Sequence, residues 1–344
     1  MSESKKARND FTLPPVIQTD DGNTRGVGFE LEYAGVDLSD SVSMLETLLD
    51  CKAEKDNAFS YRLPVEGIGD YRVEVDAALL HEGTYKEYLA SAGIDTTNLE
   101  LERRIDDLIE SLASVVVPCE IVTPPLAMDD MDIVQDIVTG LRHRNARGTG
   151  HSFLYAFGLH INAEVVSLEA GYLLAHMRAF ALLYDWICKD SKVDFSRKLS
   201  SYIKPWPAAY LKILLDPAYV PDVDTLMGDY LREVGSRNHA LDMLPVFAML
   251  DEEGVKAQAK EPDLVKGRPA FHYRLANSRI DQAHWRVADE WRYWVQVESL
   301  AHDDKRKQLL ALCRDYLESN QTSVFRPGGL WANHVADALA LESP

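Results

Sequence analysis

Hydrophobic and polar residues alternate in several short segments of the chain, which predicts β-strands because successive side chains of a strand point to opposite faces of a sheet. In the first such segment, Phe29, Leu31 and Tyr33 fall on one face, and Glu30 and Glu32 fall on the other. The predicted strands are Val27–Tyr33, Tyr71–Ala77, Val115–Thr123, Phe157–Val165 and Phe271–Ala276.

Apolar residues spaced three to four positions apart predict helices between and after these strands. The predicted helices are Leu99–Leu112, Met131–Arg142, Leu168–Asp190, Asp224–Arg232, Gln282–Leu300, Lys305–Ser319 and Ala332–Leu341. Strands mixed with long helical segments predict an α+β fold, with a mostly antiparallel sheet covered by long helices. We expect a polar tail at 1–24 and one domain at 25–344, with a helical insertion at about 80–114 and a helical C-terminal part from about 282.

The polar positions of the strands carry carboxylates, amide, imidazole and guanidinium groups, and none of the strand segments contains lysine. They are Glu30, Glu32, Arg72, Glu74, Asp76, Glu120, His160, Asn162, Glu164, His272 and Arg274. One interpretation is the solvated face of an antiparallel sheet. The other is a shared cavity, where neighbouring carboxylates are costly unless they share a cation. Carboxylates with one imidazole suit Mg²⁺ or Mn²⁺.

Two arginines lie close together near the end of the chain's last predicted strand: Arg274 within the strand, and Arg279 shortly after it. Arginine binds phosphate through two parallel hydrogen bonds and stays charged. Beside carboxylates and a divalent cation, the pair indicates phosphoryl transfer. Structural ion pairs with nearby carboxylates are the alternative interpretation.

The overall composition is that of a globular protein: 344 residues, 46% hydrophobic and 26% charged. The 36 Lys and Arg against 55 Asp and Glu give a formal net charge of −19, which opposes a nucleic-acid or anionic-membrane role. The four cysteines form no C-x-x-C motif, Met1–Asp10 has no apolar secretion signal, and Gly171–Cys188 is too polar to span a membrane. We therefore expect a cytoplasmic protein.

Several common catalytic motifs are absent from the sequence. It has no phosphate-binding G-x-x-x-x-G-K-[ST] loop, no complete dinucleotide-binding glycine motif, no G-x-S-x-G and no H-E-x-x-H. The mechanisms that depend on these motifs therefore lack support in the sequence.

Four motifs, in order, give the chain a resemblance to the amidoligase family, which belongs with glutamine synthetase and glutamate–cysteine ligase among the carboxylate–amine ligases. The resemblance extends from about residue 26 to 281. The motifs are Gly28-Phe-Glu-Leu-Glu32, Glu120-Ile-Val-Thr-Pro-Pro-Leu126, Gly158-Leu-His-Ile-Asn162 and Arg274-Leu-Ala-Asn-Ser-Arg-Ile-Asp281.

The resemblance implies a glutamine-synthetase-like sheet with an acidic concave face that binds ATP and Mg²⁺ or Mn²⁺. It implies that ATP phosphorylates a substrate carboxylate and that an amine attacks the acyl phosphate to give an amide. The partners would be a small-molecule or peptide carboxylate and an amine, without nucleic acid or membrane; a homo-oligomer is left open.

The resemblance also assigns site residues. The implied metal ligands are Glu30, Glu32, Asp76, Glu120, His160 and Asp281; the implied nucleotide-binding residues are Asn162, Arg274 and Arg279, of which the two arginines are also the candidate catalytic residues. The chain departs from the family at three of these. Asp76 lacks its usual Gly-Ser turn, which makes Glu74 an alternative; Asn162 replaces a second histidine; and Asp281 stands where glutamate is common.

Two other functions remain open. A metal-dependent hydrolase would use the same carboxylates without ATP, but it would be expected to cluster a second or third histidine. A non-catalytic relative would bind nucleotide or metal for assembly, because a fold does not determine a function.

Overall fold

The computed structural model describes residues 10–75, 118–149, 157–193, 203–320 and 331–341. These residues form a mixed α+β fold around one nine-stranded antiparallel sheet, with the order β2-β3-β4-β5-β1-β7-β9-β8 and β6 beside β1. The strands are β1 (Gly26–Tyr33), β2 (Glu54–Asn57), β3 (Ser60–Val65), β4 (Gly69–Val75), β5 (Cys119–Val122), β6 (Leu126–Ala127), β7 (Gly158–Glu164), β8 (Leu241–Asp242) and β9 (Ala270–Asn277).

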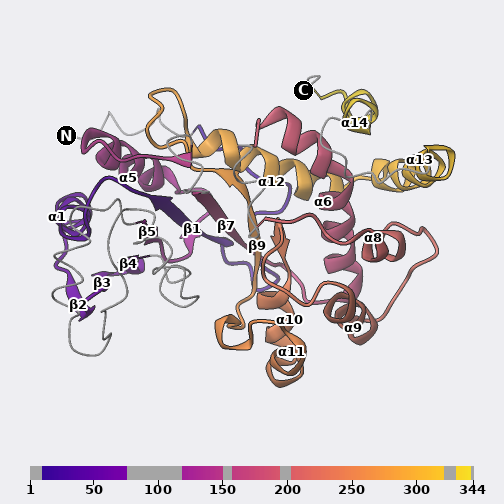
Figure 1. Cartoon of the computed structure of the whole chain (residues 1–344), viewed down its shortest axis with the longest axis horizontal. Coiled ribbons are helices and arrows are strands. Elements are labelled where there is room, and N and C mark those ends of the chain that lie inside the picture. The colour runs from indigo at the N-terminus through magenta and orange to yellow at the C-terminus, as the bar shows by residue number, and fades with distance from the viewer. Residues whose placement is uncertain (1–9, 76–117, 150–156, 194–202, 321–330, 342–344) are drawn as a thin grey trace, which may run out of the picture.

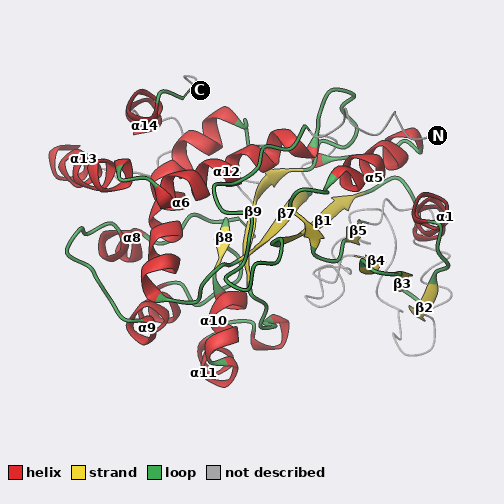
Figure 2. Ribbon diagram, turned by 180° about the vertical axis from the view of Figure 1, so that it is seen from behind, coloured by secondary structure: helices red, strands yellow, loops and turns green. Residues whose placement is uncertain are grey.

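The helices gather mainly around one end of this sheet. Figure 1 shows α1 and α5 near the β2–β5 end, and most of the other helices beyond β9; Figure 2 shows the same division from behind. The described helices are α1 (Leu38–Leu49), α5 (Asp132–His143), α6 (Ala170–Asp190), α8 (Ala208–Leu214), α9 (Val223–Glu233), α10 (Leu244–Leu250), α11 (Glu252–Gln258), the 3₁₀ turn η2 (Pro262–Leu264), α12 (Val287–His302), α13 (Lys305–Asn320) and α14 (Trp331–Leu339).

One face of the central strands is apolar and packs against α12. The ring of Phe29 meets that of Trp291 edge-on at 6.5 Å, and Trp294 contacts both Phe271 and Tyr273. All five side chains are buried. Because strand side chains alternate, the carboxylates of β1 lie on the opposite side, which we call the polar face of the sheet.

Over the described residues, the predicted strands and most predicted helices are confirmed within a few residues, but one helix begins later than expected. The helix predicted from Gln282 starts at Val287, because the preceding residues form turns in which Gln282 N donates to Arg279 O and Trp285 N to Gln282 O. The structure also adds α1 and the hairpin β2–β3, which were not predicted. The predicted helix Leu99–Leu112 and the insertion at about 80–114 lie outside the described residues.

The described part of the N-terminal segment, predicted as a polar tail, packs against the fold. Phe11 is buried, and Thr12 O accepts a 2.7 Å hydrogen bond from Trp291 Nε1. Arg25, the residue that follows this segment, contacts Val16 O and forms a fully buried two-pronged ion pair with Glu298, with both N–O distances at 2.8 Å. Contacts of this segment therefore connect the start of β1 to α12. Among the described residues, no helix has both the length and the apolar character needed to cross a membrane.

Candidate metal centre

The register of the central strands places the predicted ligands in a row on the polar face. Glu30 of β1 is directly opposite His160 of β7, and Glu32 of β1 is opposite Glu120 of β5. Glu120 is in turn opposite Glu74 of β4. Directly opposed residues of antiparallel strands have neighbouring side chains. The alternation found in each separate strand therefore becomes one continuous polar surface.

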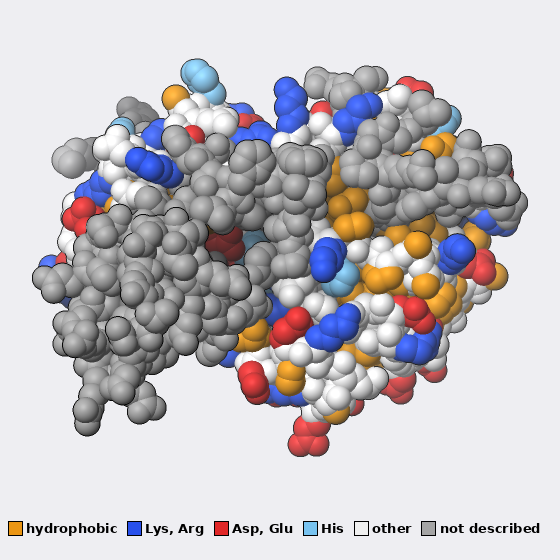
Figure 3. Space-filling model, viewed as in Figure 1, with side chains coloured by type: hydrophobic (Ala, Val, Ile, Leu, Met, Phe, Trp, Pro, Cys, Tyr) orange, Lys and Arg blue, Asp and Glu red, His pale blue; other side chains and the backbone are white. Residues whose placement is uncertain are grey.

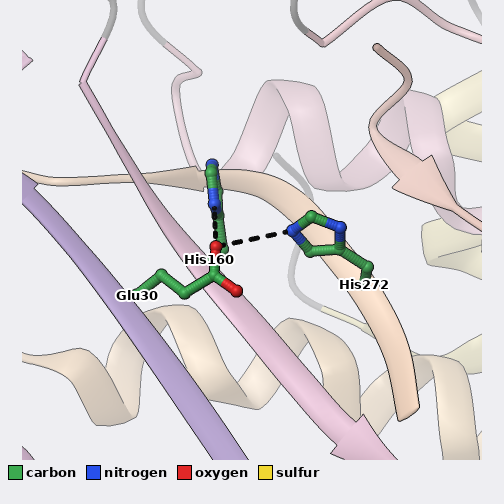
Figure 4. A group of neighbouring side chains, drawn as sticks. All are labelled: Glu30, His160 and His272. Carbon is green, nitrogen blue, oxygen red and sulfur yellow. Dashed lines mark hydrogen bonds and ion pairs between the residues drawn. The ribbon is translucent and has the colours of Figure 1, made fainter. Parts of the chain in front are cut away.

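The first of two ligand clusters joins Glu30, His160 and His272, which point toward one another from β1, β7 and β9 (Figure 4). Glu30 Oε2 lies 2.8 Å from His160 Nδ1 and 3.7 Å from His272 Nε2. The three ligand atoms lie within 4.8 Å of one another, and all three residues are buried.

The second cluster joins Glu32, Glu120 and His160, again with ligand atoms within 4.8 Å of one another. His160 Nε2 lies 3.2 Å from Glu32 Oε1, and the backbone N–H of Gly158 donates to Glu32 Oε2 at 2.6 Å. His160 thus belongs to both clusters, with one ring nitrogen toward each of the two glutamates of β1. These are the two such clusters among the described residues.

Two further side chains hold Glu30 in place. Asn162 Nδ2 donates to Glu30 Oε1 at 2.9 Å, and Arg268 Nη1 lies 3.3 Å from the same oxygen. The chain therefore surrounds this buried carboxylate with donors.

Burial and charge set the ionisation of the cluster. Burial alone would raise the pKa of Glu30, but the nearby imidazoles of His272 and His160 hold that pKa well below its usual value. Burial lowers the pKa of His160, despite the opposing effects of Glu32 and Glu30. Near neutral pH, Glu30 is therefore ionised and His160 is neutral, which are the forms that bind metal.

A register shift brings Arg274 to the cluster. The pairing between β7 and β9 changes by one residue between Leu159–Ala276 and Ile161–Tyr273, so that Arg274 and its neighbour stand opposite His160. A one-residue shift of this kind, as in a β-bulge, changes the direction in which nearby side chains point. Arg274 is buried and donates from Nη1 to Arg237 O at 2.9 Å. Burial, and then the like charge of Arg237, lower the Arg274 pKa, with Glu32 and Glu30 among the groups that oppose this shift.

Of the remaining predicted site residues, Arg279 and Asp281 are not members of either cluster. Arg279 donates from Nη2 to the carbonyls of Ser191, at 3.0 Å, and Lys192, which directly follow α6. Asp281 lies beside Gly148, where an added Cβ would stand 2.7 Å from Asp281 Oδ1. Asp76 lies outside the described residues.

The structure also brings in residues that the sequence analysis left without a role. His272 alternates onto the polar face, as the pattern of its strand indicated, but only the strand order places it next to Glu30. Asp242 lies in the two-residue strand β8, opposite His272, where no periodicity marks it. Arg268 precedes β9 and has no motif around it.

Acidic and histidine side chains can also be seen from one side of the molecule. Figure 3 shows acidic and histidine side chains near the middle of the visible face, where β1 and β7 lie in Figure 1.

Comparison with known protein families gives a match over most of the chain. The profile of the family described as "putative amidoligase enzyme" matches residues 23–296, which include β1, β5, β7 and β9 and most of α12. No match is found among curated proteins or among solved structures. The match extends over most of the chain and includes every residue of the two ligand clusters, and the chain belongs to the amidoligase family.

Proposed function

We propose that this protein is an ATP-dependent ligase that joins a carboxylate to an amine through an acyl phosphate, using Mg²⁺ or Mn²⁺. The observation that carries the proposal is the pair of clusters sharing His160, found in a chain of the amidoligase family. The proposal includes a sheet like that of glutamine synthetase. It also includes a small-molecule or peptide carboxylate as the acid.

The residues of the polar face fit divalent cations. Ionised Glu30 and neutral His160 have the required protonation, and carboxylates with imidazole are suitable ligands. Two buried atoms beside Glu30, Asn162 Oδ1 and His272 Nε2, have no hydrogen-bond partner among the described residues. Buried polar atoms normally have partners, and a cation or its bound water would supply them. Under this proposal the cations are held by Glu30, Glu32, Glu120 and His160, with Asp76 and Asp281 as further candidates.

The reaction suits such a site because a free carboxylate is a poor electrophile, with oxide as its leaving group. When bound, the cations would offset negative charge on the carboxylate and the phosphoryl group. Asn162 and Arg268 orient the Glu30 carboxylate through the contacts described above. The buried guanidinium of Arg274 lies near the same carboxylates and is the candidate for contact with transferred phosphate.

An ADP-release assay tests the proposal. The protein is incubated with ATP and Mg²⁺ or Mn²⁺, with panels of carboxylates and amines given separately and together. We expect ADP to form fastest when a carboxylate and an amine are both present. We expect this ADP release to be lost in His160→Gln. Glu54→Gln, on the exposed strand β2, is the matched control. If the protein binds ATP but releases no ADP with any of the carboxylates and amines tested, it is better explained as a non-catalytic member of the family.

A metal-dependent hydrolase is the second candidate, and His272 favours it. The cluster at Glu30 contains two imidazoles, as expected of a hydrolytic metal centre. The two functions are distinguished with the amides that the tested carboxylates and amines would form, supplied without ATP. A hydrolase cleaves these amides with metal alone, whereas a ligase forms them only while ADP is released.

A further inference from the structure

His272 is one of the most deeply buried polar residues of the polar face, with 1% of its surface exposed. Its Nε2 faces Glu30 Oε2 at 3.7 Å and has no hydrogen-bond partner among the described residues. On the other side of the ring, Nδ1 lies 3.3 Å from Asp242 Oδ2. The ring is therefore held between two carboxylates, one on β8 and one on β1.

The Asp242 contact determines which ring nitrogen is available. Asp242 is 2% exposed and lies opposite His272 in the β8–β9 pairing. When the Asp242 carboxylate accepts the N–H of Nδ1, the ring nitrogen left to bind a cation is Nε2, which is directed toward Glu30. Histidines that bind metals are typically oriented by a carboxylate in this manner.

We infer that His272 is a metal ligand through Nε2, that Asp242 is its positioning residue, and that the Glu30–His160–His272 site consequently prefers a transition-metal ion to Mg²⁺. The inference rests on the cation site of the proposed function, but it does not require ligase activity.

The preference follows from ligand chemistry. Mg²⁺ favours oxygen ligands in near-octahedral geometry and retains several waters. Imidazole nitrogen binds divalent transition metals better, with affinity rising from Mn²⁺ to Cu²⁺ along the first row. A cluster of one carboxylate and two imidazoles therefore favours Mn²⁺ over Mg²⁺, whereas the neighbouring cluster of Glu32, Glu120 and His160 has two carboxylates and one imidazole.

Calorimetric titration of the metal-free full chain with Mn²⁺, and separately with Mg²⁺, measures the preference. The variants are His272→Gln and Asp242→Asn. His176→Gln is the control, because His176 is also 1% exposed but stacks on Phe271 on the apolar side of the sheet. We expect Mn²⁺ affinity to fall by about 10- to 100-fold in both site variants. Mg²⁺ affinity should change much less, and the control should bind both ions like the wild type.

Pulsed electron paramagnetic resonance of the Mn²⁺-loaded wild type gives a second readout that needs no variant. We expect the couplings of two imidazole nitrogens in the wild type, and of one in His272→Gln if that variant folds. Coupling to no more than one nitrogen in the wild type, or unchanged Mn²⁺ affinity in folded His272→Gln, would overturn the inference. A negative ADP-release assay would overturn the ligase proposal but would not change these metal-binding results. Failure of the proposed function can therefore be distinguished from failure of this inference.

Discussion

Glu30 of β1 and His160 of β7 are direct partners across neighbouring strands, with Glu30 Oε2 2.8 Å from His160 Nδ1, although they are 130 residues apart in sequence. The same register buries Phe29 against Trp291 on the other face. A slip of one residue would exchange the two faces of β1 and send Glu30 into the apolar core. Packing of the core therefore also determines the geometry of the ligand clusters.

Glu30→Gln should reduce the stabilisation of the protein by Mn²⁺, because it removes a charged ligand from the first cluster. A cation present at 100 times its Kd stabilises the native state by about 2.7 kcal/mol, and weaker binding lowers this increment. Thermal melting with and without millimolar Mn²⁺ measures it. Glu54→Gln, on exposed β2, should retain the full shift. An equal Mn²⁺ shift in Glu30→Gln and wild type would exclude Glu30 as a ligand.

Trp291→Ala should destabilise the fold by about 3–5 kcal/mol, the usual cost of deleting a buried tryptophan. The sequence analysis predicted an apolar stripe on this helix, and Trp291 is fully buried, with its Nε1 bonded to Thr12 O. Denaturant unfolding measures the loss, while ATP affinity per folded molecule should stay unchanged. Normal stability with a selective loss of ATP affinity would instead assign the helix to a nucleotide pocket.

The strands that carry the site could be predicted from the sequence because period-two alternation is a local signal. Glu30, Glu32 and His160 were assigned to polar strand faces in that way. Their distances could not be predicted, since the order β4-β5-β1-β7-β9 joins segments that are far apart in the chain. Asp242 was missed because a two-residue strand has no periodicity. The hairpin strand β2 was missed because all its residues are exposed and no apolar alternation marks it.

Arg279 should contribute to stability through the end of α6. Its side chain donates hydrogen bonds to the carbonyls of Ser191 and Lys192. Arg279→Ala removes this charged donor from both carbonyls and should lower the free energy of unfolding by about 1–3 kcal/mol. Arg279→Lys keeps the charge but loses the planar fork, so turnover should fall more than ATP binding if Arg279 also contacts the transferred phosphoryl group. Normal turnover of folded Arg279→Ala would leave Arg279 a purely structural role.

His176 should make the fold sensitive to acid. Burial lowers the pKa of His176 from 6.5 to about 3. Between these values the unfolded chain takes up a proton that the folded imidazole does not, so the free energy of unfolding falls as the pH decreases through this window. The contribution is at most about 1.4 kcal/mol per pH unit. Urea unfolding at pH 7, 6 and 5 should show a shallower decline in His176→Gln than in wild type, and parallel declines would contradict the assignment.

Isotope transfer tests the proposed ligase most directly. The carboxylate identified by the ADP assay is labelled with ¹⁸O in both oxygens and incubated with the protein, ATP, Mn²⁺ and the amine. An acyl phosphate contains one carboxylate oxygen as its bridge, and attack by the amine releases that oxygen with phosphate. Mass spectrometry should therefore find one ¹⁸O in each phosphate released and one in the amide. Phosphate without label, or amide formed without ADP, would contradict the proposed reaction.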